Sequence, residues 1–147
     1  MTRQTAAADA ATSQAIAQEL PTWDLADLYP GPDSPAVEAD FTKADKAAKE
    51  FAAACQGKLA GLSGAALAAA IGEYERIEEI LGRLMSYAQL LFSGDSTNAE
   101  IGRFYQTVSE RVTAISSHLL FFALELNRLD DAVLEQKLAD PTLARWQ

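Results

Sequence analysis

The sequence predicts an all-α protein, an elongated helical bundle built on a long antiparallel helix hairpin. Three observations lead to this prediction. Apolar residues recur in alternating steps of four and three over residues 101–129, which places them on one face of a helix. Alanine, the strongest helix former, supplies much of the 49% hydrophobic content. No stretch alternates apolar and polar residues over a length that would suit a strand.

The apolar stripe predicts one unbroken helix over residues 98–128. Its members are Ile101, Tyr105, Val108, Val112, Ile115, Leu119, Phe122, Leu126 and Leu129. A helix of about 31 residues would be roughly 46 Å long at about 1.5 Å per residue. A compact domain of this chain length would be only about 38 Å across. We therefore expect an elongated module rather than a sphere.

Two segments precede the helical part of the chain. Residues 1–20 are rich in Ala, Thr, Gln and Ser and have little to bury, so we expect a mobile tail. Residues 21–33 are predicted to form an anchor segment and loop, in which Thr22 caps a short helical turn and Pro30 ends it. The apolar side chains of this segment should pack onto another surface; they are Trp23, Leu25, Leu28 and Tyr29.

Residues 34–147 are predicted to form the helical domain. Ser34 caps its first helix, and Pro35 occupies the first position, where a missing N–H costs nothing. This helix ends near residues 57–61. Ser63 caps a second helix, which ends where Gly94 supplies a C-terminal cap.

The hairpin is predicted from the loop that follows the second helix. Thr97 and Glu100 have capping-box spacing, so the long third helix should begin at residue 98. The second and third helices would then have nearly equal length and a loop of about four residues, which favours antiparallel packing. Asp130 caps a short helix, and Pro141 opens another.

Two features indicate that the chain belongs to something larger. Residues 119–126 are apolar nearly all round the predicted helix, and three amphipathic helices cannot easily surround such a segment. The last predicted helix stops at Gln147 before it completes a face. We therefore expect a piece of a larger protein, or a protomer that needs a partner and forms a homo-oligomer.

Composition argues against several classes of function. The net charge of -9 argues against nucleic acid and anionic membrane surfaces as partners. No run of about 18 apolar residues is present, so no membrane-spanning helix is predicted. Cys55 is the single cysteine, which excludes an intrachain disulfide and favours a reducing compartment. Without a secretory signal pattern, we expect a cytoplasmic protein.

No catalytic, cofactor-binding or metal-ligating residue is predicted in this chain. A zinc peptidase helix needs two histidines one turn apart, and the only histidine is His118. A di-iron bundle needs Glu-x-x-His, and the residue three before His118 is Ile115. Ser117 and His118 are adjacent on a helix and point in different directions, so they do not form a nucleophile and its base.

Several residues have a structural and a functional interpretation, and the structural one is favoured for each. His118 lies at the edge of a packed face, or lines a cleft in a larger assembly. Cys55 is a small core residue, or a reactive thiol. Glu125 lies on a solvated line and pairs with Arg128, or faces an interior cleft.

The glutamates of residues 73–79 resemble a carboxylate cluster, but a solvated face is favoured, with Glu79 paired to Arg83. Gly72, Gly82 and Gly102 lie inside predicted helices, where close backbone packing is favoured over a bend that permits motion. The heptad stripes are typical of an intramolecular bundle core, because short connections join them, rather than of a free coiled coil.

Three stretches of the chain resemble oligoendopeptidase F proteins. The first is Trp23-Asp24-Leu25-x-Asp27-Leu28-Tyr29 with the Pro/Gly loop after it. The second is Tyr74-Glu75 leading to Gly82-Arg83-Leu84-Met85-Ser86-Tyr87-Ala88-x-Leu90, then Phe92 and Asp95. The third is Ser117 through Phe121-Phe122-x-Leu124-Glu125-Leu126, followed by Asp130-Asp131. Together they span about residues 21–146 in the same order as in that family.

The family belongs with the thimet-oligopeptidase-like zinc metallopeptidases. The resemblance implies a mostly helical, bowl-like cytosolic enzyme of roughly 600 residues. Such an enzyme hydrolyses short peptides in a deep channel. It also implies zinc held by a His-Glu-x-x-His helix and a later glutamate, all beyond residue 147. No residue here matches those groups, so the chain would carry no cofactor itself, and its partner would be the missing C-terminal catalytic domain.

Two functions are therefore weighed. The first is a non-catalytic N-terminal helical domain that forms the wall or lid of a peptidase channel. The alternative is a free-standing helical module for self-association or protein interaction. A His-Glu-x-x-His segment encoded downstream would favour the first, and a natural stop codon after Gln147 would favour the second.

Overall fold

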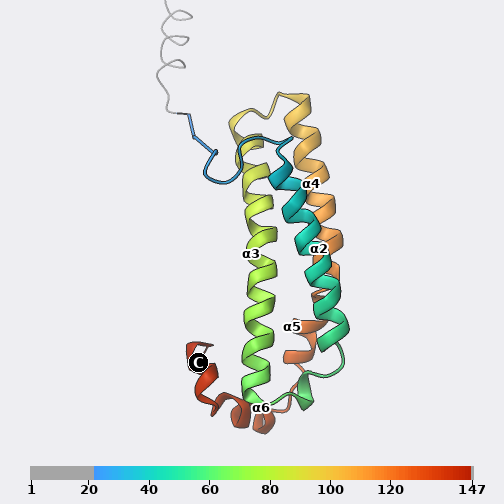
Figure 1. The fold of residues 1–147 in the computed structure, drawn as a ribbon, viewed down its shortest axis with the longest axis vertical. Helices are drawn as coiled ribbons and strands as arrows, with labels where there is room; N and C mark the ends of the chain where they lie inside the picture. The colour runs from blue at the N-terminus through green and yellow to red at the C-terminus, as the bar shows by residue number, and fades with distance from the viewer. Residues whose placement is uncertain (1–21, 147) are drawn as a thin grey trace, which may run out of the picture.

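The structure is a computed structural model that describes residues 22–146. Helices and short 3-10 turns are its only regular elements, and no strand occurs within that range, so the predicted all-α class is confirmed. Three long helices run side by side, and the short C-terminal elements gather at one end (Figure 1). The tail predicted for residues 1–20 lies outside the described residues.

Helix α2 spans Pro35–Cys55; it begins where its cap predicts and ends shortly before the predicted residues 57–61. The Ser34 hydroxyl accepts a hydrogen bond from the N–H of Ala36 (3.2 Å) and Pro35 opens the first turn. The buried face of α2 follows the predicted four-three spacing and consists of Val37, Phe41, Ala44, Ala48 and Phe51. The helix ends just before Gly57, whose φ of 76° lies in the left-handed region that favours glycine.

Helix α3 spans Gly64–Gly94 and follows a short 3-10 turn, η1, at Leu59–Gly61. The Ser63 hydroxyl accepts from the N–H of Ala66 (3.1 Å), which confirms the predicted cap. At 31 residues, α3 is about 46 Å long at about 1.5 Å per residue. Of the two long helices of nearly equal length expected from the sequence, this one therefore forms at full length.

The prediction of one unbroken helix over residues 98–128 is wrong. The chain forms α4 at Ala99–Ser117 and a separate short helix, α5, at Leu120–Leu126. The hydroxyl of Ser117 donates to the carbonyl of Ala114 (2.6 Å). The N–H groups of His118 and Leu119 bond three residues back rather than four (3.0 and 2.9 Å). This tightened turn redirects the chain, and both sides of the break keep the same apolar spacing.

The chain returns to α3 after α5. Helix α6 spans Asp131–Leu138, and a 3-10 helix, η2, spans Pro141–Trp146. Leu143 of η2 is fully buried against Leu67 and Ala68 of α3. The predicted last helix did not complete a face, but the observed 3-10 helix buries Leu143 and packs Trp146 beside it within about two turns.

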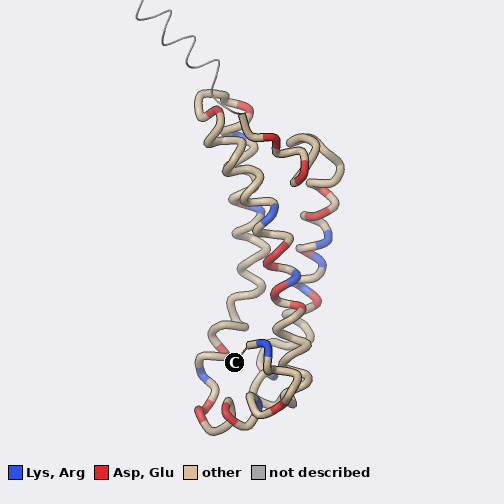
Figure 2. Tube along the Cα trace, turned by 90° about the vertical axis from the view of Figure 1, so that its left-hand side faces the viewer, with Lys and Arg blue, Asp and Glu red and all other residues tan. Residues whose placement is uncertain are grey.

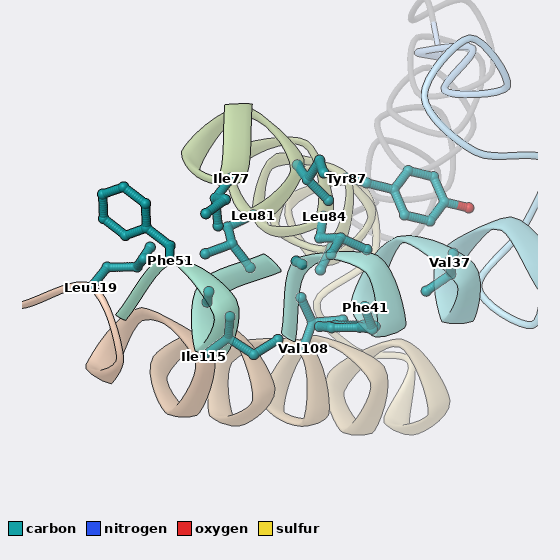
Figure 3. Packing of buried hydrophobic residues seen from close by; sticks show 14 of the residues in the cluster. Val37, Phe41, Phe51, Ile77, Leu81, Leu84, Tyr87, Val108, Ile115 and Leu119 are labelled. Carbon is teal, nitrogen blue, oxygen red and sulfur yellow. The ribbon is translucent and has the colours of Figure 1, made fainter. Parts of the chain in front are cut away.

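The main core lies between the three long helices (Figure 3). Side chains of α3 and α4 point into the space beside α2. The buried positions of α4 belong to the predicted apolar stripe, whereas Ala70, Ile80 and Tyr87 of α3 are core residues that were not predicted. The buried members shown in Figure 3 are Val37, Phe41, Phe51, Ile77, Leu81, Leu84, Tyr87, Val108, Ile115 and Leu119. Such burial supplies most of the free energy of folding, at about 25 cal/mol per Å² of apolar surface.

Two predicted caps shift by one or two residues. Asn98, rather than Thr97, caps α4, because its side-chain oxygen accepts from the N–H groups of Glu100 (2.9 Å) and Ile101 (3.3 Å). Thr97 instead donates to Asp95 (2.8 Å).

In the anchor segment the turn falls on residues 26–28, and Asp24 takes the role predicted for Thr22 by accepting from Ala26 N–H (3.0 Å). Tyr29 is buried, whereas Trp23 is 65% exposed.

Candidate interaction surfaces at the α5 end of the molecule

Helix α5 divides the apolar run of residues 119–126 between the core and the outside. Phe122 is 3% exposed and stacks on Tyr74 (ring centroids 4.8 Å apart), with its edge against Phe51 (5.3 Å). Leu120 and Leu124 are 63% and 56% exposed. Since they lie four residues apart, they occupy one outward face of α5. The expectation that this chain cannot surround the whole run is confirmed at these two leucines.

Glu125 secures α5 to the loop after α2. Its carboxylate accepts a hydrogen bond from the N–H of Gly57 (2.6 Å), and a longer contact reaches the N–H of Leu59 (3.5 Å). The predicted pairing of Glu125 with Arg128 is therefore wrong. A carboxylate that accepts from backbone N–H groups makes a charge-assisted bond, so Glu125 has a structural role that sequence spacing could not reveal.

An apolar hollow of about 400 Å³ lies between α2 and α3 near the same end. We call it the α2–α3 groove. It is lined by Ala47, Glu50, Phe51, Ala54, Cys55, Leu62, Ala66, Ala69, Ala70 and Glu73. Alanines at these positions on both helices leave the groove open, because they are too small to fill the space between the two backbones. The alanine content predicts helices that approach one another closely, but it does not show where the space between two helices stays open.

Acidic and basic residues are interleaved along the helices (Figure 2). The glutamates of residues 73–79 have different partners and form no carboxylate cluster, as the favoured interpretation predicts. Glu73 pairs with Arg76 in its own helix, whereas Glu75 accepts from Arg145 (2.8 Å) and from the indole N–H of Trp146 (2.7 Å). The predicted pairing of Glu79 with Arg83 is wrong, since Arg83 reaches Asp40 on α2 (3.5 Å).

The single cysteine and histidine lie near this end, but they do not meet in a reactive arrangement. Cys55 is half-buried on the groove, and burial raises the pKa of its thiol, which disfavours the thiolate. His118 is half-buried in the turn between α4 and α5. Within residues 22–146, no group of three or more His, Cys, Asp or Glu side chains could hold a metal ion.

Lys137 on α6 is the buried charged residue of this end. Its ammonium donates to the carbonyls of Ala60 (3.0 Å) and Leu62 beside a hollow of about 610 Å³. These bonds cover the last carbonyls of η1 and connect α6 to the chain before α3. The lysine is therefore satisfied by backbone oxygens and has a structural role.

Comparisons of the chain with protein-family models, with curated proteins and with solved structures found no match. Over residues 22–146, no helix combines the length and the apolar character that crossing a membrane requires.

Proposed function

We propose that this chain is the N-terminal, non-catalytic helical domain of an oligoendopeptidase F-like zinc metallopeptidase. In this proposal it forms a wall or lid over a channel in which short peptides are hydrolysed in the cytoplasm. The zinc and the catalytic groups belong to a C-terminal domain beyond residue 147. The proposal rests on the three stretches of sequence that resemble the family.

One observation on the structure supports the proposal most directly. Leu120 and Leu124 form an exposed apolar pair on α5, although neighbouring Leu119 and Phe122 are buried. Exposing two large apolar side chains side by side is unfavourable unless another surface covers them. A catalytic domain continuing from the same end of the bundle could provide that surface.

The experiment compares the 147-residue chain with the product of the reading frame extended downstream. We expect the extended protein to cleave a quenched fluorescent peptide in a zinc-dependent manner, and the 147-residue chain to be inactive. The substitutions Leu120→Glu and Leu124→Glu should lower the activity and thermal stability of the extended protein. Ala132→Glu, at an exposed site on α6, is the control. Zinc-dependent cleavage by the 147-residue chain alone, or a stop codon after Gln147, would refute the proposal.

A second candidate function is favoured by the same exposed leucines. A free-standing module could cover them with a second copy of itself and act through self-association. Light scattering over a range of chain concentrations distinguishes the candidates when the reading frame ends at Gln147. Reversible dimer formation that Leu124→Glu abolishes would support the module, whereas a strict monomer at high concentration would exclude it.

A further inference from the structure

Away from the α2–α3 groove, the chain's own anchor segment packs against the same two helices. There the hydroxyl of Tyr29 donates to Asp40 (2.6 Å), and its ring meets the edge of Tyr87 (5.2 Å). Arg83 joins this contact through its ion pair with Asp40. The two contacts of Tyr29 therefore hold a short helical turn against both α2 and α3.

The α2–α3 groove lies farther along the same two helices. On α2, Asp40 is followed at steps of seven by Ala47 and Ala54. On α3, Tyr87 is preceded at steps of seven by Ile80, Glu73 and Ala66. Residues seven apart lie on roughly one side of a helix, so the anchor contacts and the groove lie on the same side of the α2–α3 pair. No residue of α4 lines the hollow, so within residues 22–146 this side of the α2–α3 pair has no third helix.

We propose that the α2–α3 groove binds an amphipathic helix. This helix carries small apolar side chains on one face and Lys or Arg on both flanks. Alanine walls allow helix axes to approach within about 8 Å. A helix seated there would complete a four-helix arrangement with α2, α3 and α4. This inference does not depend on the peptidase proposal, because the groove requires no catalytic domain.

The acidic residues on the groove walls favour basic residues on both flanks of the bound helix. Glu50 on α2 and Glu73 on α3 lie on opposite walls of the groove. Each is paired only with an exposed cation of its own helix, Lys46 (3.8 Å) and Arg76 respectively. Such exposed pairs contribute at most about 1 kcal/mol, so cations of a partner can replace them. A second copy of this acidic chain, at a net charge of -9, is a poor match for these walls.

Cys55 provides a direct readout, because it lines the groove and is the only cysteine. The probe is a synthetic helical peptide with an Ala/Leu face and lysines on both flanks. The control peptide has glutamates in place of the lysines. The rate at which a maleimide modifies Cys55 in the full 147-residue chain is measured against peptide concentration. We expect saturable slowing by the lysine peptide, and an affinity about tenfold lower for the glutamate peptide.

Two sets of variants test the site and the charges separately. Ala69→Arg fills the groove and should abolish the slowing, whereas Ala65→Arg, exposed on the same helix but outside the groove, should not. The double variant Glu50→Lys and Glu73→Lys should reverse the preference and favour the glutamate peptide. Far-UV circular dichroism checks that each variant is folded. Reversal of preference is an outcome that loss of folding cannot imitate.

Four outcomes would overturn the proposal. The first is that neither peptide slows the modification of Cys55. The second is that charge reversal leaves the preference unchanged. The third is that Cys55 is protected without peptide and becomes reactive when residues 1–21 are deleted, since the occupant would then be this chain's own N-terminal segment. The fourth is protection that rises with chain concentration alone, since the occupant would then be a second copy.

Discussion

Phe122 is the residue on which the packing of α5 depends. It is in contact with aromatic rings from both α2 and α3, so one side chain connects three elements. We expect Phe122→Ala to lower the free energy of unfolding by about 3–5 kcal/mol, because truncation leaves a cavity between those rings. Urea denaturation followed by circular dichroism measures the change. An unchanged midpoint would contradict the placement of Phe122 in the core.

At Gly82 a substitution is expected to raise, and not lower, the free energy of unfolding. The sequence favoured close backbone packing at Gly72 and Gly82, and this is wrong, because a Cβ at either position would meet no atom within 4 Å. We expect Gly82→Ala to raise the free energy of unfolding by about 0.5–1 kcal/mol, since alanine has less backbone entropy to lose in a helix. Thermal denaturation measures the gain.

The matched control is Gly64→Ala at the start of the same helix. A Cβ at Gly64 would overlap the side chain of Asp140, so this substitution should destabilise the fold. Equal effects of the two alanine substitutions would contradict the packing described for α3.

At the scale of elements, Asp140 joins η2 to the start of α3. Its carboxylate accepts from the N–H (2.9 Å) and hydroxyl (2.7 Å) of Thr142, and these bonds, with one from the backbone of Ala65, hold its pKa below the usual range. A lowered pKa in the folded state contributes stability above the unfolded pKa of about 3.9, and this stability is lost as pH falls through the folded value.

We therefore expect Asp140→Asn to have a lower free energy of unfolding than the natural chain at neutral pH. The gap between the two free energies should narrow as pH falls below about 4. Urea denaturation at a series of pH values measures the gap. A difference that stays constant through the acid range would contradict the role given to the Asp140 carboxylate.

The break between α4 and α5 is the element that sequence reasoning missed. The four-three spacing continues without interruption through residues 115–126, so a straight helix and a bent one bury the same stripe. The local signals for the turn are weak, because Ser117 and His118 occur in helices as well as at their ends. The turn is favoured by what lies beyond it, namely the rings of Phe51 and Tyr74 that receive Phe122.

At the scale of the whole molecule, the exposed leucines of α5 should add nothing to the stability of this chain by itself. We expect the double variant Leu120→Gln and Leu124→Gln to change the free energy of unfolding by no more than about 0.5 kcal/mol, because both side chains are mostly in water already and glutamine is a good helix former. Urea denaturation measures this, beside Phe122→Ala. A loss comparable to that of Phe122→Ala would mean that the leucines are buried in the folded chain.

The sequence by itself determined the helical class, where α2 and α3 begin, and where α3 ends. Their caps, Ser34 and Ser63, and their apolar faces are local features, and local chemistry is enough to begin, end and orient a helix.

Only the tertiary structure decided where the third stripe bends and which partners Glu125, Arg83 and Glu75 choose. It also decided which apolar residues are exposed on α5 and where the space between α2 and α3 stays open as the α2–α3 groove. Those outcomes depend on which helices meet side by side. Residues as far apart as Gly57 and Glu125 meet only after the helices have packed, so no local pattern can specify their contact.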